Sequence, residues 1–453
     1  MRDIILASVV SALLLLIFKH PVIGAYLWAW LGLMNPHKMA YGFARTLPWA
    51  LLAAIFTLLA VAMTKKRQAV PMSSIVVVQV LLVLHMGFTS FFSLASGSVP
   101  LDRFIFVFKI HMMLFVTWML VCDNKQLRWL IWVVTMSVGF FGIKGGIWTL
   151  MTGGGGRVWG PSGGMLEGNN ELAVALVMLL PMVYFLRQTE TNKWVRRALM
   201  VSGVAMVFSV LGSQSRGALL GLLAMSVFLG LKGKYPVRTS LGLVIFVALA
   251  IGFMPDSWSG RMESIRSYQA DNSAMSRIWT WTTLWNAALD RPLIGAGFGA
   301  DNAVVFGKYA PLDGDFAVFR GSVFVAHSIY FQMLGEHGFV GLGLFLLLGL
   351  VTWFSAGRLA RLTKDDPEFG PWIPLLMRMV QVSLIGYGTG GAFLSVAYLD
   401  LPYYIIGFVV TATALVRNRA QRPVPVAAPT PAAAGKPPRP GFPPHANANA
   451  KPE

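Results

Sequence analysis

The chain is poor in charged residues and has a single cysteine. Of its 453 residues, 12% are charged and 56% are hydrophobic, and the mean hydropathy is +0.63. A soluble globular protein carries about 25% charged residues, so this composition excludes a soluble domain and predicts a polytopic membrane protein. Because Cys122 has no second cysteine as a partner, an intrachain disulfide is excluded as well.

Acidic residues are especially scarce. The chain has 19 acidic against 37 basic residues, which gives a formal net charge of +18. In a soluble protein this balance would suggest nucleic-acid binding, but here the basic residues form short clusters between apolar runs, where they set the orientation in a membrane. We therefore expect membrane lipids, and no nucleic acid, as partners.

Long apolar runs fill most of the chain. A transmembrane helix needs about 20 apolar residues, and the runs near this length lie at 46–64, 74–93, 103–122, 127–150, 170–187, 198–213, 217–231, 238–254, 330–357, 373–394 and 403–417. The first 35 residues add an uncleaved first span and a half-length apolar piece around Pro21 to Met34. The expected fold is an all-α polytopic membrane protein with about 12 transmembrane helices.

Basic clusters between the spans predict the topology. The clusters on one side lie at 65–67, 125–128, 193–197, 232–238, 358–364 and 417–419. The positive-inside rule makes that side cytoplasmic, so the opposite loops face the periplasm of a multi-pass protein of the bacterial inner membrane. We expect about ten spans in 1–254, a large helical periplasmic loop in 255–326, C-terminal spans in 327–417 and a disordered cytoplasmic tail in 418–453.

Familiar nucleotide and metal motifs are missing. Gly153 to Gly156 is not followed by Gly-Lys-Ser/Thr, and Gly295-Ala-Gly-Phe-Gly299 lacks the strand context of a dinucleotide fingerprint. Asp313-Gly-Asp315 resembles a metal-binding Asp-x-Asp, but Asp-Gly is also ordinary turn chemistry. We therefore expect neither a metal ion nor a cofactor.

Two histidines stand where the longest polar loop enters an apolar run. His327-Ser328 and Glu336-His337-Gly338 are separated by ten residues, a rise of about 15 Å on a continuous helix, so the imidazoles cannot share one metal ion. For His327, a hydrogen-bonded core residue is the leading interpretation. Around His337, glycines leave a pocket or a close backbone neighbour, whereas Glu336 faces another direction on a helix.

Arg216 lies in a polar turn, Gly212-Ser-Gln-Ser-Arg-Gly217, between two apolar runs. It either snorkels to the membrane interface or forms part of a site, and the small polar neighbours, Gln214 among them, favour a site. Imidazole can move a proton near neutral pH. A histidine and arginines at one membrane face therefore suit chemistry on an anionic lipid head group.

Further arginines gather in the predicted outer loops. The large loop carries Arg261, Arg266, Arg277 and Arg291 among four tryptophans, and Arg157 follows the glycines of the loop 151–169. Guanidinium groups bind pyrophosphate oxygens well. An interfacial helix that binds anionic lipid nonspecifically would have a similar composition, and a flexible lid is the alternative for 151–169.

Three ionisable residues, Lys109, His111 and Lys144, lie inside apolar runs, where a charge is costly and often functional. Together with Arg378 they would line the path of a transporter for lipid-linked sugars. Most of the non-cytoplasmic arginines, however, lie at the outer face, which favours a transferase over a transporter.

The chain resembles the O-antigen ligase and polymerase superfamily over roughly residues 160 to 350. The resemblance is carried by Ser215-Arg216-Gly217, Ser276-Arg277-x-Trp279, Pro292-Leu-Ile-Gly-Ala-Gly297, His327-Ser328 and Gly335-x-His337-Gly338. The amino-terminal part, with Asn35-Pro36-His37-Lys38 and Tyr41-Gly42-Phe43-Ala44, also resembles O-glycosylation ligases associated with exosortase systems.

The resemblance implies a GT-C-like, metal-independent and inverting transferase. Such an enzyme moves a glycan from undecaprenyl pyrophosphate to a hydroxyl of the lipid A-core oligosaccharide in the periplasm. His337 matches the functional histidine of the family and Arg216 its arginine in the short outer turn, whereas Arg277 or Arg266 would match the loop arginine. We expect His337 to take the proton from the acceptor hydroxyl or to orient it, and Arg216, Arg266 and Arg277 to hold the pyrophosphate. The remaining candidates are Arg261, Arg157 and Arg291 for pyrophosphate, and His327 and Gln214 as further participants. An O-antigen polymerase and a protein O-oligosaccharyltransferase are the alternatives.

Overall fold

The computed structural model describes residues 1–65, 67–232, 236–252, 254–255 and 272–421, and every regular element among them is a helix. The helices of the main bundle are α1 (Arg2–Lys19), α2 (Val22–Met34), α3 (Trp49–Met63), α4 (Ser74–Ser90), α5 (Val99–Leu120), α6 (Asn124–Met151), α7 (Asn169–Thr189), α8 (Lys193–Gly212), α9 (Arg216–Lys232), α10 (Pro236–Gly252), α14 (Ile329–Leu362), α15 (Ile373–Gly390) and α16 (Asp400–Ala420). The shorter elements and the helices of the large loop are η1 (Pro36–Met39), η2 (Phe43–Arg45), α12 (Asn272–Asp290), α13 (Ala303–Tyr309), η4 (Gly314–Phe319) and η5 (Gly391–Phe393). The expected all-α fold is confirmed.

Several of these helices are suited to a membrane. Within the described residues, α5, α6, α7, α8, α14 and α16 are long and apolar enough to cross it, and α2, α3, α4 and α9 are apolar but shorter. Large apolar side chains such as Leu15 and Phe354 are 71% and 69% exposed on the outside of the bundle, where lipid would cover them. The protein is therefore a multi-pass membrane protein, and the expected number of about 12 spans stays a prediction.

The half-length apolar piece near the amino terminus is the complete helix α2. Its Tyr26 hydroxyl donates a hydrogen bond of 3.0 Å to the Gln126 carbonyl at the start of α6. At the other end of α2, a Cβ on Gly32 would lie 3.2 Å from the Asp400 carboxylate at the start of α16. The short helix therefore runs along the bundle from the beginning of α6 to the beginning of α16.

Small residues let the central helices approach closely. A Cβ on Gly146 of α6 would lie 2.0 Å from the backbone oxygen of Ala205 in α8, and one on Gly221 of α9 would lie 3.1 Å from the Gly386 oxygen of α15. Such contacts are typical of membrane helices, which gain stability from close packing because lipid is as apolar as their side chains. The contact between α9 and α15 holds the Arg216 turn beside the end of α15.

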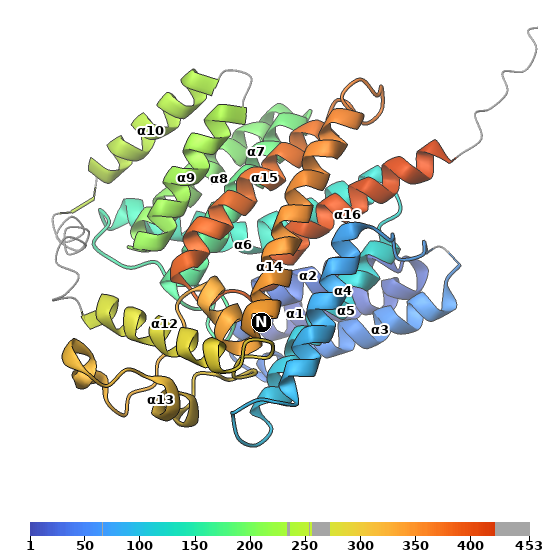
Figure 1. Cartoon of the computed structure of the whole chain (residues 1–453). Coiled ribbons are helices and arrows are strands. Elements are labelled where there is room, and N and C mark those ends of the chain that lie inside the picture. Colours follow the sequence, from blue (N-terminus) through green and yellow to red (C-terminus); the bar gives the residue numbers. More distant parts are fainter. Residues whose placement is uncertain (66, 233–235, 253, 256–271, 422–453) are drawn as a thin grey trace, which may run out of the picture.

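Loops that are far apart in the sequence meet at one end of the bundle, beside α12 and α13 (Figure 1). The Leu94 amide donates to the Ala296 carbonyl at 2.8 Å, the Val158 amide to the Gly212 carbonyl at 3.1 Å, and the His327 amide to the Ser395 hydroxyl at 2.7 Å. We call this the α12 end. Residues 256–271 of the large loop and 422–453 of the tail lie outside the described residues, so the predicted disorder of the tail stays a prediction.

Candidate functional site

Helix α14 is broken at Gly338, one residue after His337. Gly338 has a φ of 66° and a ψ of −170° inside a helix of 34 residues. This left-handed backbone region suits glycine, and a Cβ here would lie 2.4 Å from the Pro292 carbonyl oxygen. The break frees backbone groups of the preceding turn, which in an apolar surrounding must find other partners.

The glycine-rich loop 292–299 supplies those partners. The Ala296 amide donates to the Gly335 carbonyl at 2.7 Å, the Gly297 amide to the Glu336 carbonyl at 2.9 Å, and the Phe339 amide to the Pro292 carbonyl at 2.8 Å. The close backbone neighbour expected from the glycines around His337 is thus confirmed. The glycines of 295–299 allow one backbone to approach another, and this accounts for them without a nucleotide.

His337 is completely buried beside this break. Its exposed fraction is 0%, its Nδ1 lies 2.7 Å from the Thr89 hydroxyl, and its Nε2 lies 2.8 Å from the Tyr398 hydroxyl. The His85 ring is nearby, with its Nε2 bonded at 3.0 Å to the His337 carbonyl. Both imidazole nitrogens therefore have protein partners, and an incoming hydroxyl would have to displace one of them.

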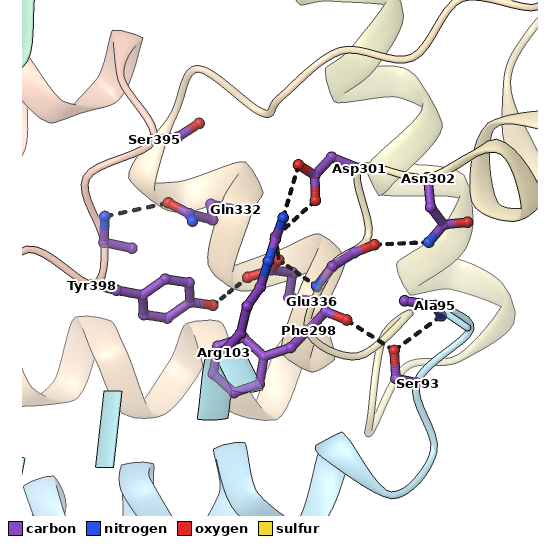
Figure 2. A network of polar contacts seen from close by, with 12 residues as sticks. Ser93, Ala95, Arg103, Phe298, Asp301, Asn302, Gln332, Glu336, Ser395 and Tyr398 are labelled. Carbon is purple, nitrogen blue, oxygen red and sulfur yellow. Dashed lines mark hydrogen bonds and ion pairs between the residues drawn. The ribbon is translucent and has the colours of Figure 1, made fainter. Parts of the chain in front are cut away.

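The Tyr398 hydroxyl joins His337 to Glu336. This hydroxyl donates to Glu336 Oε2 (Figure 2). Since a tyrosine has one hydroxyl hydrogen, its oxygen accepts from Nε2–H of His337 at the other contact. Burial, and then the neighbouring Glu336, raise the pKa of Tyr398 well above its usual range, so the hydroxyl stays a donor. One tyrosine therefore bridges Glu336 and His337, although neighbouring side chains face different directions on a helix.

Glu336 is also tied to two other segments. Its Oε1 accepts from the Gly299 amide at 3.0 Å and from Arg103 Nη1 at 3.5 Å. Arg103, near the start of α5, lies between the Glu336 and Asp301 carboxylates and donates to both Asp301 oxygens at 2.7 and 3.1 Å (Figure 2). The Glu336 side chain is only 5% exposed, and a buried carboxylate is tolerated when donors of this kind surround it.

These groups line a polar cavity of about 220 Å³ at the α12 end. Its walls include Arg103, Asp301, Glu336, Gln332 and Ser395. Typical ligand pockets measure about 300–1,000 Å³, so this cavity suits one unit of a larger substrate. The mixture of a guanidinium, carboxylates, an amide and a hydroxyl offers both donors and acceptors to a sugar hydroxyl.

The backbone of His327 is attached to the wall of this cavity: the preceding residue, Ala326, lines it, and the His327 amide donates to the hydroxyl of the lining residue Ser395 at 2.7 Å. Its ring is half-buried, and its φ of 45° is unusual for a residue other than glycine. The Trp281 indole holds the adjoining Ala326 carbonyl at 2.7 Å from α12. A non-glycine residue kept in the left-handed region needs such fixed surroundings and is common at functional sites.

Arg277 lies close enough to His327 to act on it electrostatically. Burial lowers the pKa of His327, and the positive charge of Arg277 lowers it further. Arg277 is on α12, one helical turn before Trp281, and the Trp281 ring stacks on Phe331 of α14 with ring centroids 5.0 Å apart. Two candidates separated by 50 residues in the sequence are therefore brought together. His327 in its neutral form is able to accept a proton.

Arg216 begins helix α9 beside α15. The residue next to it, Gly217, packs against Phe393 of η5, whose ring centroid lies 6.5 Å from that of Trp281. The turn before it contains Gln214 with a φ of 59°. Contacts through Phe393 and Trp281 thus connect the turn of Arg216 with the segment of α12 that carries Arg277.

The other predicted arginines have different surroundings. Arg157 Nε donates to the Gln214 Oε1 at 3.3 Å. Arg291 Nη2 donates to the Phe92 carbonyl at 2.5 Å and so attaches the end of α12 to the loop after α4, which fits a structural role better than pyrophosphate binding. Arg261 and Arg266 lie outside the described residues.

Sequence reasoning overlooked Arg103, Asp301 and Tyr398. Arg103 lies at the start of a long apolar run. The rule that an ionisable residue in an apolar run is a functional candidate, which singled out Lys109, His111 and Lys144, could therefore have identified it as well. His111 is buried against the Tyr403 ring at 4.6 Å, and its Nδ1 bonds to the Val107 carbonyl at 2.9 Å, as a core histidine would. Asp301 and Tyr398 are 198 and 295 residues from Arg103 and carry no local signal.

Comparison with known proteins bears on the family of this chain. Residues 201–346 match the O-antigen ligase family model, and residues 1–191 match a family of unknown function, DUF5935. The exopolysaccharide production protein ExoQ of Rhizobium meliloti (strain 1021) is 25% identical over 225 residues, 47% of this chain and 48% of the relative. The chain thus spans about half the length of the curated relative that it matches. The two matches support membership in the O-antigen ligase and polymerase superfamily.

Proposed function

We propose that this protein is an O-antigen ligase. It transfers a glycan from undecaprenyl pyrophosphate to a hydroxyl of the lipid A-core oligosaccharide at the periplasmic face of the bacterial inner membrane, without a metal ion or cofactor. The observation that carries the proposal is the polar cavity lined by Glu336, Asp301 and Ala326, because most of its walls fall inside the region that matches the O-antigen ligase family.

In this mechanism His327 takes the proton from the hydroxyl of the acceptor sugar. The His327 ring is half-buried, its backbone amide bonds to Ser395 of the cavity wall, and its lowered pKa keeps the imidazole neutral near pH 7. Positioned proton transfer of this kind is typically worth about 10²–10⁴-fold in rate. His337, which the sequence led us to expect in this role, has both ring nitrogens occupied by Thr89 and Tyr398. These contacts fit a positioning role for His337.

Arg277 and Arg216 bind the pyrophosphate. The acceptor oxygen attacks the anomeric carbon and forms the new glycosidic bond, while the bond from that carbon to the pyrophosphate oxygen breaks. The electron pair leaves with undecaprenyl pyrophosphate, and the hydroxyl proton passes to His327. Fixed guanidinium groups stabilise the charge that develops on the leaving oxygen, and removal of one such donor typically costs about 10²–10³-fold. Direct displacement inverts the anomeric centre.

The chain His337–Tyr398–Glu336 positions the cavity wall. Glu336 accepts hydrogen bonds from Tyr398 and from the Gly299 amide, and Arg103 lies beside it. The carboxylate therefore has one orientation toward the cavity, where it and Asp301 can accept hydrogen bonds from sugar hydroxyls. Such preorganisation matters because small displacements of a bound reactant are costly in rate.

The test is transfer by the purified protein in detergent. Undecaprenyl-pyrophosphate-linked O-antigen is mixed with rough lipopolysaccharide in EDTA, and the gel ladder is followed. We expect a new high-mass ladder with the wild type and none with His327→Ala, while both proteins purify alike. If the wild type gives no ladder although the donor is intact, the ligase function is rejected. If His327→Ala gives an unchanged ladder, His327 is rejected as the base.

A second candidate is a polymerase that joins repeat units. The observation in its favour is the name of the similar Rhizobium protein, which concerns exopolysaccharide production. The same preparation distinguishes the two, because a polymerase would lengthen undecaprenyl-pyrophosphate-linked repeat units in the absence of lipopolysaccharide. Glycan attached to an added protein would instead indicate a protein O-oligosaccharyltransferase, and uptake of the lipid-linked glycan into vesicles would indicate a transporter.

A further inference from the structure

A second and larger cavity lies at the α12 end, away from His327. Its volume is about 650 Å³, and its walls come from the start of α1, the segment around η1 and η2, the last turns of α6 and the loop after α6. All of these residues belong to the part of the chain that matches a family of unknown function. The volume falls within the range of about 300–1,000 Å³ that is typical of ligand pockets.

Five cations line this cavity and no acidic residue does. The cations are Arg2, Lys38, Arg45, Lys144 and Arg157. None of them forms an ion pair within the described part of the chain. The nearest carboxylate in the sequence, Asp3, accepts the amides of Gly42 and Ala44 at 2.9 and 3.1 Å and so fixes the segment that carries Arg45. The cavity therefore has a strong excess of positive charge.

Lys144 differs in position from a basic residue that anchors a helix end at the membrane interface. It lies seven residues before the end of α6, which corresponds to about 10 Å of helix, and it belongs to an otherwise apolar run. A lysine at this depth is costly unless it faces a polar space or a counter-ion. Trp148 lies one turn further along α6 and lines the same cavity, so Lys144 faces the space that the other four cations surround.

Aromatic rings are interleaved with these cations. Tyr41, Trp148 and Trp159 also line the cavity, and the Arg2 guanidinium lies 5.5 Å from the centre of the Tyr41 ring. Flat aromatic surfaces suit the apolar faces of sugar rings, whereas lysine and arginine bind phosphate and carboxylate groups. The two kinds of side chain together fit a saccharide that carries negative charge.

We propose that this cavity binds an anionic saccharide through its phosphate groups. On the proposed function, on which this role rests, the saccharide is the acceptor. The cavity adjoins the reaction site through the hydrogen bond between Arg157 and Gln214, which lies two residues before Arg216 in the same turn. An acceptor held here would lie beside the turn that binds the donor pyrophosphate.

The experiment measures binding apart from transfer. Full-length protein is placed in nanodiscs of phosphatidylcholine, and its affinity for rough lipopolysaccharide is compared with that for enzymatically dephosphorylated rough lipopolysaccharide. The variants are Lys38→Gln and Lys144→Gln, and the matched control is Arg196→Gln, an exposed cation at the start of α8. We expect each cavity variant to weaken binding roughly tenfold, in line with one lost charge-assisted contact. The control should bind like the wild type.

Three results would overturn the proposal. They are equal binding of the phosphorylated and dephosphorylated ligand, equal binding by the cavity variants and the wild type, and loss of lipopolysaccharide binding when phosphatidylglycerol replaces phosphatidylcholine. The last result would assign the cavity to a lipid head group. Charge-dependent binding by a wild type that transfers no glycan from intact donor would support the cavity and reject the proposed function, so the two failures are distinguishable.

Discussion

His327 and His337 are close in the sequence, but their surroundings differ. His337 follows a broken turn of α14, has no exposed surface and bonds through both ring nitrogens to Thr89 and Tyr398. His327 is half-buried, has an unusual backbone conformation and lies near the positive charge of Arg277. The difference teaches that two histidines of neighbouring motifs can have opposite surroundings, and on the proposed function His337 serves the architecture of the site while His327 meets the substrate.

The largest effect expected from this comparison is the loss of His327. We expect His327→Ala to lower the transfer rate by roughly 10²–10⁴-fold, with little change in Tm because the ring is half-buried. His337→Ala should instead lower the Tm strongly, because it leaves a cavity and two buried partners without their bonds. Rate assays and tryptophan-fluorescence melting of both variants check this. A stable but inactive His337→Ala beside an active His327→Ala would reverse the two roles.

Removal of Arg277 is expected to have the next largest effect. Arg277→Ala should reduce transfer by about 10²–10³-fold, because a fixed donor to the leaving pyrophosphate is lost. Arg320→Ala, which removes an exposed cation from the same loop, is the matched control and should keep full activity. Similar activities of the two variants would show that Arg277 contributes only general positive charge.

The role of Tyr398 is tested by Tyr398→Phe. This change keeps the ring but removes the hydroxyl that joins His337 to Glu336, leaving buried polar groups unpaired at a cost of roughly 1–3 kcal/mol in the free energy of unfolding. Transfer should fall about tenfold through a less well-oriented cavity. Thermal unfolding measures the change in stability, and separate values of KM and kcat measure the change in transfer. Unchanged stability would mean that the bridge contributes little.

The smallest expected effect is a shift of the pH profile. A base whose pKa is lowered stays neutral, and hence active, down to a lower pH than an ordinary histidine. Activity should therefore fall on acidification through an apparent pKa below 6.5, which is the ordinary value. In Arg277→Lys the cation is retained, whereas in Arg277→Gln it is lost. The acid limb of Arg277→Gln should thus move to higher pH, and residual activity with an unmoved limb would argue against His327 as the base.

Much of the architecture could be predicted from local patterns. The apolar runs predicted the helices of the bundle, because membrane insertion demands about 20 apolar residues for each span and leaves a clear signal. The polar turn at Arg216 and the glycines around His337 were also placed correctly as a helix connection and a close backbone approach. The branch of O-glycosylation ligases and the number of spans stay predictions.

The interior of the site could not be predicted in this way. The orientation of Glu336 depends on the position of Tyr398, which lies 62 residues further along the chain. The pair of Arg103 and Asp301 joins segments 198 residues apart. Side-chain contacts of this range depend on how the loops pack at the α12 end, and a single sequence holds no periodic pattern for them.

The sequence by itself determined the class of this protein. Its apolar runs require helices, because lipid offers no partners to unpaired backbone groups, and its short motifs resemble those of the O-antigen ligase and polymerase superfamily, a resemblance that the family match over 201–346 supports. The tertiary structure decided which polar groups meet. It buried His337, brought His327 to Arg277 and gathered five cations around one cavity, because these contacts depend on the packing of loops that are far apart in the chain.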